Sequence, residues 1–190
     1  MLPIAIDAAR VRIVLVGNGD AARRRLALLD EAGAMRVQVF ADAPGGDLAA
    51  AAGDRLRRRL PAAGEIADAQ LAFLAAVVEP ALSRLRHIAN SAGVLLNVED
   101  DVAGCDFHSP AVVRRGDLTL AISTGGKCPG LAAAIRRQIE ASFGPEWQGR
   151  LDRLAALRAR WREAGRDGAA IARLTTIWFD RHGRFALRTD

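Results

Sequence analysis

A glycine-rich turn that directly follows a short apolar run constrains the fold of this chain more than any other feature. The run covers residues 11–16 and reads Val-Arg-Ile-Val-Leu-Val. The turn consists of Gly17, Asn18, Gly19, Asp20, Ala21 and Ala22. A β-branched apolar run that ends at a glycine is typical of a strand buried on both faces. We therefore expect a strand that passes through this turn into the next element.

The residues after the turn predict a helix and then a second strand. Ala22, Leu26 and Leu29 recur at helical spacing, and the pattern stops at Gly33, where a helix can end. Residues 37–40 form the next apolar run. Strand, glycine turn, helix and strand in this order make a βαβ unit, whose crossover is right-handed.

The alternation of strands and helices continues to about residue 145. Further apolar runs predict strands at 71–78, 94–98 and 118–123, and helices at 79–92 and 130–143. The stretch 47–70 predicts an Ala-rich helix and a short strand near Arg59 and Leu60. After Pro145 the pattern is helical, with an apolar stripe made by Trp147, Leu151, Leu154, Leu157 and Trp161. The predicted fold class is α/β, a parallel sheet domain followed by a helical part.

The spacing Gly17-x-Gly19-x-x-Ala22 between a strand and a helix predicts a dinucleotide site. Gly17 permits the tight turn, Gly19 lets the backbone approach a pyrophosphate, and Ala22 keeps helix and strand close. Asp42, at the end of the second strand, is placed to bind the adenosine ribose, which favours NAD over NADP. Arg23–Arg25 favour NADP if they face the ribose, but we expect most of them to be solvated. The alternative is a glycine turn in an α/β domain that binds no nucleotide.

Two later segments carry groups that catalysis uses. Asn97-Val-Glu-Asp-Asp101 ends a predicted parallel strand, where open α/β sheets bind their ligands. Clustered carboxylates there can act as general acid or base, although a solvated turn explains Glu99, Asp100 and Asp101 equally simply.

The other segment is a second glycine-rich turn between a strand and a helix. It contains Ser123, Thr124, Gly125, Gly126 and Lys127, followed by Cys-Pro-Gly. Such a loop can bind anions, but it lacks the Lys-Ser/Thr spacing of a phosphate loop that hydrolyses nucleotide triphosphates. The structural alternative is a capped helix start with Pro129 in its first turn.

Composition excludes several functional classes. The net charge is +5 with Lys127 as the only lysine, and no basic run is interleaved with aromatic residues, so we expect no nucleic acid partner. Only two cysteines are present, and the three histidines show no metal-ligand spacing, so we expect no metal site. His108, close to the acidic cluster, is the histidine to test. Without a signal peptide or an apolar span, the expected location is the cytoplasm, with no membrane partner.

Four stretches together resemble a known family, the precorrin-2 dehydrogenase/sirohydrochlorin ferrochelatase module of siroheme synthases. They are Val-Gly-Asn-Gly-Asp-Ala-Ala (16–22) with Leu-Leu-Asp-Glu-Ala-Gly-Ala (28–34), Leu-Leu-Asn-Val-Glu-Asp (95–100), Cys-Asp-Phe-His-Ser-Pro-Ala (105–111), and Leu-Ala-Ile-Ser-Thr-Gly-Gly-Lys-Cys-Pro-Gly-Leu-Ala (120–132). The last two are far more specific than the dinucleotide fingerprint.

The resemblance implies an organisation and an activity. It implies an NAD-binding Rossmann-like domain over residues 1–113, a dimerisation segment over 114–144, and a helical C-terminal domain over 145–190, working as a homodimer. The implied activity is an oxidoreductase that converts precorrin-2 to sirohydrochlorin with NAD, in siroheme or cobalamin biosynthesis. Some relatives also insert iron.

The resemblance also implies roles for individual residues. The essential aspartate after Asn-Val-x falls on Asp100, which becomes the general base or proton shuttle. The carboxylates of the tetrapyrrole substrate give Arg114, Arg115 and Lys127 an anionic ligand. Further substrate-binding candidates are His108, Ser123, Thr124, Gly125 and Gly126.

Two departures from the family leave alternatives open. Residues 77–80 read Val-Val-Glu-Pro where relatives commonly carry a Thr-Asp turn that touches the cofactor, and Glu99 replaces an apolar residue. A divergent protein that binds a nucleotide or tetrapyrrole without catalysis is one alternative. A chelatase that uses Asp100, and His108 transiently, is the other.

Overall fold

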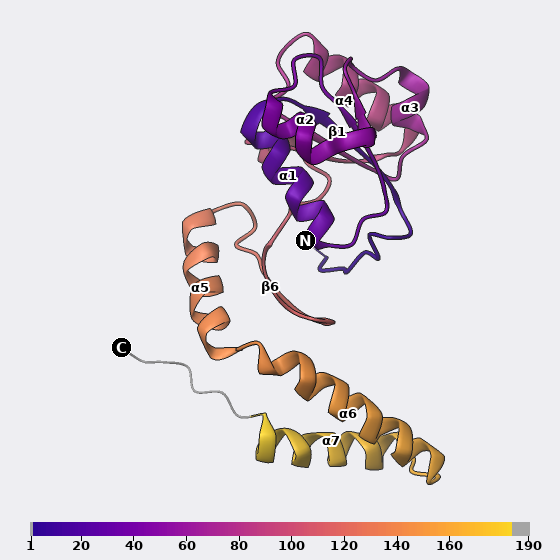
Figure 1. Ribbon diagram of the computed structural model, residues 1–190, viewed down its shortest axis with the longest axis vertical. Coiled ribbons are helices and arrows are strands. Elements are labelled where there is room, and N and C mark those ends of the chain that lie inside the picture. Colours follow the sequence, from indigo (N-terminus) through magenta and orange to yellow (C-terminus); the bar gives the residue numbers. More distant parts are fainter. Residues whose placement is uncertain (1, 184–190) are drawn as a thin grey trace. The chain divides into compact units, whose positions relative to one another are not determined.

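The computed structural model describes residues 2–183, and the chain divides into two compact units, 1–108 and 109–190, each described by itself. The first unit is built on one parallel sheet of five strands in the order β3-β2-β1-β4-β5. Figure 1 labels its central strand β1 and the helices α1 to α4 around it. Its strands are β1 (Arg12–Gly17), β2 (Arg36–Phe40), β3 (Leu56–Arg57), β4 (Leu71–Ala75) and β5 (Leu95–Val98). This order reverses direction between β1 and β4, which is the point where doubly wound sheets bind dinucleotides.

Helices cover both faces of this sheet. The helices are α1 (Gly19–Glu31), α2 (Gly46–Ala52), α3 (Ala63–Ala67) and α4 (Ala81–Ala92), with short 3₁₀ turns η1 (Gly53–Arg55) and η2 (Val102–Gly104). Successive side chains of a strand point to opposite faces. Ile13 and Leu15 of β1 therefore join the core under α1 and α2, whereas Val14 and Val16 join the core under α3 and α4.

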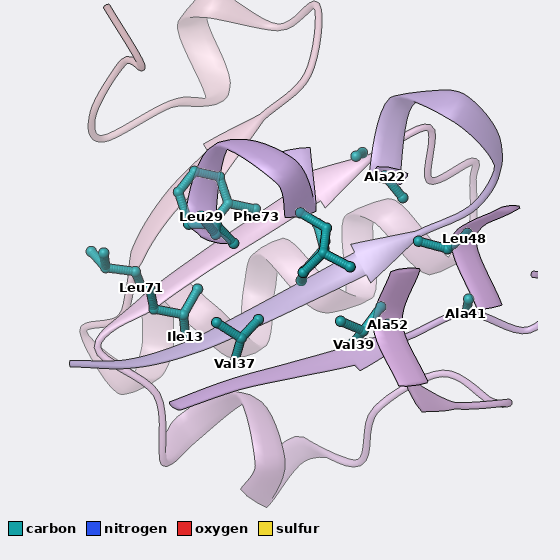
Figure 2. Packing of buried hydrophobic residues seen from close by; sticks show 13 residues of the cluster. Ile13, Ala22, Leu29, Val37, Val39, Ala41, Leu48, Ala52, Leu71 and Phe73 are labelled. Atoms are coloured by element: carbon teal, nitrogen blue, oxygen red, sulfur yellow. The ribbon is translucent and has the colours of Figure 1, made fainter. Parts of the chain in front are cut away.

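The core under α1 and α2 is closely packed and wholly apolar. Figure 2 shows side chains of β1, β2 and β4, such as Ile13, Val39 and Phe73, in one cluster with Ala22 and Leu29 of α1 and Ala52 of α2. Burying one Leu, Val or Phe side chain contributes roughly 1.5–3 kcal/mol. This packing holds the carboxyl ends of β1, β2 and β4 in fixed register, and those ends carry the candidate site.

The sheet confirms the predicted α/β fold, with corrections at two places. The short strand β3 lies at Leu56–Arg57 and pairs with β2, earlier than the expected Arg59 and Leu60. Strand β4 ends at Ala75 instead of continuing to residue 78, because Ala76 takes a φ of 56° that leaves the extended conformation. Residues 77–80 are thereby free to form a turn.

The second unit contains a two-stranded hairpin and three helices. Strands β6 (Ala111–Arg115) and β7 (Leu118–Ile122) pair antiparallel, and α5 (Pro129–Ser142), α6 (Glu146–Glu163) and α7 (Gly168–His182) follow. Its aromatic contacts include Phe143 against Trp147 and Trp147 against Phe179, with ring centroids 4.8 and 6.1 Å apart.

The sequence analysis did not identify β6. This strand extends across the predicted domain boundary between residues 113 and 114, and the three-domain division stays a prediction. Among residues 2–183, no helix has the length and apolar character needed to cross a membrane.

Candidate active site

Gly17 is required by the packing of β1 against β4. Its φ is 154°, and a Cβ atom at this position would lie 1.9 Å from the carbonyl oxygen of Ala75, its partner on β4. Gly19 takes a φ of 62°, and within residues 2–183 no atom beyond its neighbours in the chain lies within 4 Å of the place a Cβ would occupy. Glycine at this position therefore serves the backbone conformation and not close packing. The close packing of Gly17 against β4 was not expected from the sequence, and the approach of Gly19 to a pyrophosphate stays a prediction.

Asn18 links the glycine turn to the end of β2. Its Nδ2 donates to Asp42 Oδ1 at 2.7 Å, and the amide of Ala43 donates to Asn18 Oδ1 at 3.1 Å. Asn18 occupies the N-cap position of α1, but its side chain makes no capping hydrogen bond to the helix. The first-turn amides of α1 thus keep the electropositive character that attracts anions.

Two hollows flank the turn, both within the first unit. One, of about 210 Å³, is lined by Gly19, Asp20, Arg23, Gly45, Gly46, Asp47 and Leu48. The other, of about 270 Å³, is lined by Ala21, Arg24, Leu74, Ala76, Val77, Leu82 and residues 98–101. The glycine turn therefore lies between a hollow beside α2 and a hollow at the ends of β4 and β5.

The acidic residue of the turn is neutralised by its own helix. Asp20 Oδ1 accepts a hydrogen bond of 2.6 Å from Arg23, and Arg24 also binds this carboxylate. The hydrogen bond from Arg23 is the largest of the interactions that lower the pKa of Asp20. A negative charge in the first turn would otherwise repel a phosphate, so these arginines keep the turn suited to an anion.

Arg23 and Arg24 of α1 are exposed, as expected for most of these arginines, and Arg25 is the exception. Arg24 also lies 3.9 Å from Glu99, and Arg25 is half-buried with its guanidinium 5.1 Å from the Phe73 ring centroid. Burial lowers the pKa of Arg25, while the negative charge of Glu99 opposes that shift. Glu99, which departs from the family pattern, therefore faces two arginines of α1.

Asp100 and Asp101 are neighbours with different surroundings. Asp101 accepts hydrogen bonds from Arg86 at 2.6 Å and from the Gly104 amide at 2.9 Å, and the bond from Arg86 is the main cause of its lowered pKa. Asp100 is exposed, lines the hollow at the end of β5, and makes no hydrogen bond or ion pair within the part of the chain described. Its φ of 60° is a left-handed conformation that Asp tolerates better than most residues. Asp100 is thus the carboxylate available for chemistry.

The segment after the acidic loop pairs with β5 through side chains. The Asp106 amide donates to Leu96 O at 2.8 Å, and Asp106 Oδ2 accepts from the Leu96 amide at 2.9 Å. Buried Asn97 donates through Nδ2 to Phe107 O at 2.9 Å. The stretches 95–100 and 105–111 therefore meet in space. The sequence analysis missed this structural role, although the short spacing between the two stretches was the signal for it.

The remaining predicted residues belong to the second unit, apart from half-buried His108 at the end of the first. Ser123 Oγ accepts from the Gly125 amide at 3.2 Å, and Thr124 Oγ1 accepts from the Cys128 amide at 3.3 Å. Gly125 and Gly126 have φ values of 62° and 79°. The two hydroxyls thus shape the loop that leads into α5, and the contact of this loop with substrate stays a prediction.

Arg115 makes hydrogen bonds to the protein backbone that its predicted role in substrate binding did not include. Its Nε donates to Phe143 O at 2.6 Å, and its Nη2 donates to Glu140 O at 3.1 Å. A cation at the C-terminal carbonyls of a helix stabilises that end. Arg115 therefore fastens the hairpin to the end of α5, and its role as a substrate contact also stays a prediction. Within residues 2–183, no group of three His, Cys, Asp or Glu side chains is placed to hold a metal ion.

Two family models match the chain. The model described as "Putative NAD(P)-binding" matches residues 4–111, and the model described as "Sirohaem biosynthesis protein central" matches residues 115–142. The first covers more than half of the chain and includes every residue of the glycine turn, Asp42 and Asp100.

Curated relatives and a solved structure point the same way. A siroheme synthase of Neisseria meningitidis serogroup C is 32% identical, over 97% of this chain and 38% of that protein. Siroheme synthase 1 of Cronobacter sakazakii is 37% identical, over 81% of this chain and 33% of that protein. The chain thus spans little more than a third of these relatives. The structure titled "SirC, precorrin-2 dehydrogenase" superposes with a TM-score of 0.72 at 22% identity, covering 93% of this chain and 88% of that one, and it confirms the fold.

Proposed function

This chain belongs to the family described as "Putative NAD(P)-binding", and from that premise we propose that it oxidises precorrin-2 to sirohydrochlorin with NAD as the hydride acceptor. The single observation that carries the proposal is the position of Asp100. An unpaired carboxylate lines the hollow next to the glycine turn, at the end of the strand beside β4. The siroheme synthases and the precorrin-2 dehydrogenase named above support the choice of reaction.

The glycine turn fits a dinucleotide. At Gly17 a side chain would clash with the Ala75 carbonyl, and the amides at the start of α1 have no side-chain cap to displace. These amides would hold the pyrophosphate, and Asp42 would bind the adenosine ribose hydroxyls through the oxygen that Asn18 does not use. The carboxylate of Asp42 disfavours a 2′-phosphate, and so NAD is the proposed cofactor. When bound, it supplies the hydride acceptor.

In the proposed reaction, Asp100 is the base that takes the proton released from the substrate. Conversion of precorrin-2 to sirohydrochlorin removes a hydride, which goes to NAD, and a proton, which needs a base. The Asp100 carboxylate makes no hydrogen bond within residues 2–183 and borders the same hollow as Ala76 and Val77, so it can take that proton. Asp101 is occupied by Arg86 and therefore has a structural role.

The second unit supplies the proposed substrate contacts and the proposed dimer. Ser123, Thr124, Gly125, Gly126 and Lys127 carry amides, hydroxyls and a cation that suit a polycarboxylate. Arg115 of the same unit and His108 at the end of the first unit are further candidates. For the proposed homodimer, the exposed apolar side chains Leu131 and Ile177 of this unit are surface that a second copy would cover. The two free cysteines support a location in the reducing cytoplasm.

The test is turnover with the purified chain. Precorrin-2 and NAD are mixed without oxygen, and absorbance follows NADH and sirohydrochlorin together. We expect both products in equal amounts and a strong preference for NAD over NADP. If neither product forms while NAD still raises the thermal midpoint, a binding protein without catalysis is favoured instead, and Val77–Pro80 is the segment to examine. Iron insertion into added sirohydrochlorin would separately identify a chelatase.

A further inference from the structure

The thiol of Cys105 contacts the loop that carries Asp100 at its base, next to the hydrogen bonds between Asp106 and Leu96. Residues 99–104 leave β5 and return to Cys105, whose Sγ accepts from the Val98 amide at 3.1 Å. The same thiol lies 3.2 Å from Val98 O and 3.1 Å from Asp101 O, within reach to donate its proton to either. Cys105 therefore contacts both the start and the middle of the loop.

Asn97 supports this thiol from inside the protein. Its side chain is 6% exposed, and Nδ2 lies 3.5 Å from Cys105 Sγ while donating to Phe107 O. Phe107 in turn packs edge-to-face on Phe73 of β4, with ring centroids 5.2 Å apart. The thiol is thus fixed to the sheet that also carries the glycine turn.

Asp101 fastens the other part of the loop. Its backbone amide donates to Val98 O at 3.4 Å, and its carboxylate accepts from Arg86 and from the Gly104 amide. Between the two attachments, Asp100 is held in a left-handed conformation. A non-glycine residue pays about 1 kcal/mol or more for that conformation and keeps it only where the surroundings enforce it.

We infer that Cys105 is a positioning residue for Asp100. Its thiol contacts Val98 at the start of the loop and Asp101 in its middle, and thereby fixes where the Asp100 carboxylate lies in the hollow. This inference rests on the proposed role of Asp100 as base. The thiol needs both of its hydrogen-bonding capacities for the task, since it accepts from one backbone amide and donates to a backbone carbonyl. A residue that lacks either capacity loses one of these hydrogen bonds to the loop backbone.

The experiment compares Cys105→Ala with Cys105→Ser and with the control Val102→Ala. Serine keeps a donor and an acceptor, alanine keeps neither, and Val102 is an exposed residue of the same loop whose side chain is 54% exposed. With precorrin-2 and NAD we expect kcat to fall about tenfold to 100-fold in Cys105→Ala, with KM for NAD unchanged. Cys105→Ser should recover most of that loss, and Val102→Ala should match the wild type.

Hydrogen exchange on the full chain, without substrate, gives a readout that does not depend on activity. In Cys105→Ala the amides of Val98, Asp101 and Gly104 should exchange faster, while those of β1 stay protected. Unchanged exchange in the loop, or full kcat in Cys105→Ala, would overturn the inference. If the wild type shows no turnover, the proposed function fails, and exchange alone still decides whether Cys105 holds the loop.

Discussion

The two units of this chain bury their apolar side chains to very different extents. The first unit has two continuous cores on either side of a five-stranded sheet, and side chains such as Leu15, Leu26 and Leu85 are fully buried. In the second unit, the buried hydrophobic residues among those described are Val113, Ala132, Phe143, Trp147 and Ile171. Burial of apolar area is the main driving force of folding. Because the first unit buries more apolar side chains than the second, we expect the first unit to be the more stable of the two.

The tryptophans allow this comparison to be measured. Trp147, Trp161 and Trp178 all belong to the second unit. Tryptophan fluorescence therefore reports on that unit alone, while far-ultraviolet circular dichroism reports on both. If the units differ in stability as proposed, the two signals will follow different unfolding curves, which is the usual sign of behaviour that is not two-state.

The largest expected effect comes from a cavity in the first core. Leu85 of α4 is 0% exposed, so Leu85→Ala should cost about 2–5 kcal/mol of unfolding free energy. The matched change in the second unit, Leu154→Ala, removes a half-buried side chain of α6 and should cost less. Denaturant unfolding followed by circular dichroism and fluorescence measures both. Equal losses in the two variants would remove the proposed contrast.

Glycine replacement should give opposite signs in the two units. Gly17→Ala places a Cβ against the Ala75 carbonyl, and we expect a loss of about 1–3 kcal/mol together with loss of NAD binding. Gly149→Ala lies inside α6, where the nearest atom to a new Cβ is 3.8 Å away, and it should stabilise the helix by about 0.5–1 kcal/mol. Thermal midpoints and NAD titration check both variants. NAD binding by Gly17→Ala at wild-type affinity would show that the turn does not hold the cofactor.

Asn18 should affect cofactor choice more than stability. Asn18→Ala removes the hydrogen bond to Asp42 and the acceptor for the Ala43 amide, at a cost of about 1 kcal/mol. With Asp42 no longer oriented, the preference for NAD over NADP should narrow. Binding titrations with both dinucleotides measure this preference. An unchanged preference for NAD over NADP in Asn18→Ala would show that Asn18 does not affect cofactor specificity.

Acid should weaken the first unit through Glu65. The pKa of this carboxyl is lowered to about 2 by the hydrogen bond from Arg59, with help from the Ala62 amide. A folded-state pKa below the unfolded value contributes stability above the unfolded pKa, and this contribution is lost as the pH falls from about 4.5 towards 2. Because the pair is exposed, the effect should be small. Glu65→Gln should flatten the pH dependence of unfolding in that range, and an unaltered slope would exclude this pair as its source.

Local sequence patterns predicted the parts of the fold that depend on local physics. The apolar run before Gly17 was sufficient to predict β1, and the spacing of Ala22, Leu26 and Leu29 was sufficient to predict α1. Both patterns depend only on residues close together in the sequence. The resemblance singled out Asp100, and its surroundings distinguish it from Asp101.

The missed features depend on contacts between distant residues. The bond from Asn18 to Asp42 joins positions 24 apart, and Arg115 reaches the end of α5 across 28 positions. The bonds between Asp106 and Leu96 span only 10 positions, and the short spacing of the two stretches was their one signal in the sequence. Strand β6 was missed because its pairing partner, β7, and not its own composition, defines it.

The most direct test of the central claim compares Asp100→Asn with Asp101→Asn in turnover of precorrin-2 with NAD. Asn tolerates the left-handed conformation at position 100, so the first change removes the base and keeps the backbone. The account predicts that Asp100→Asn lowers kcat by about 100-fold or more at unchanged NAD affinity. Asp101→Asn should mainly lower stability, because it weakens the pair with Arg86. Full dehydrogenase activity in Asp100→Asn, or no NADH from the wild type, would contradict it.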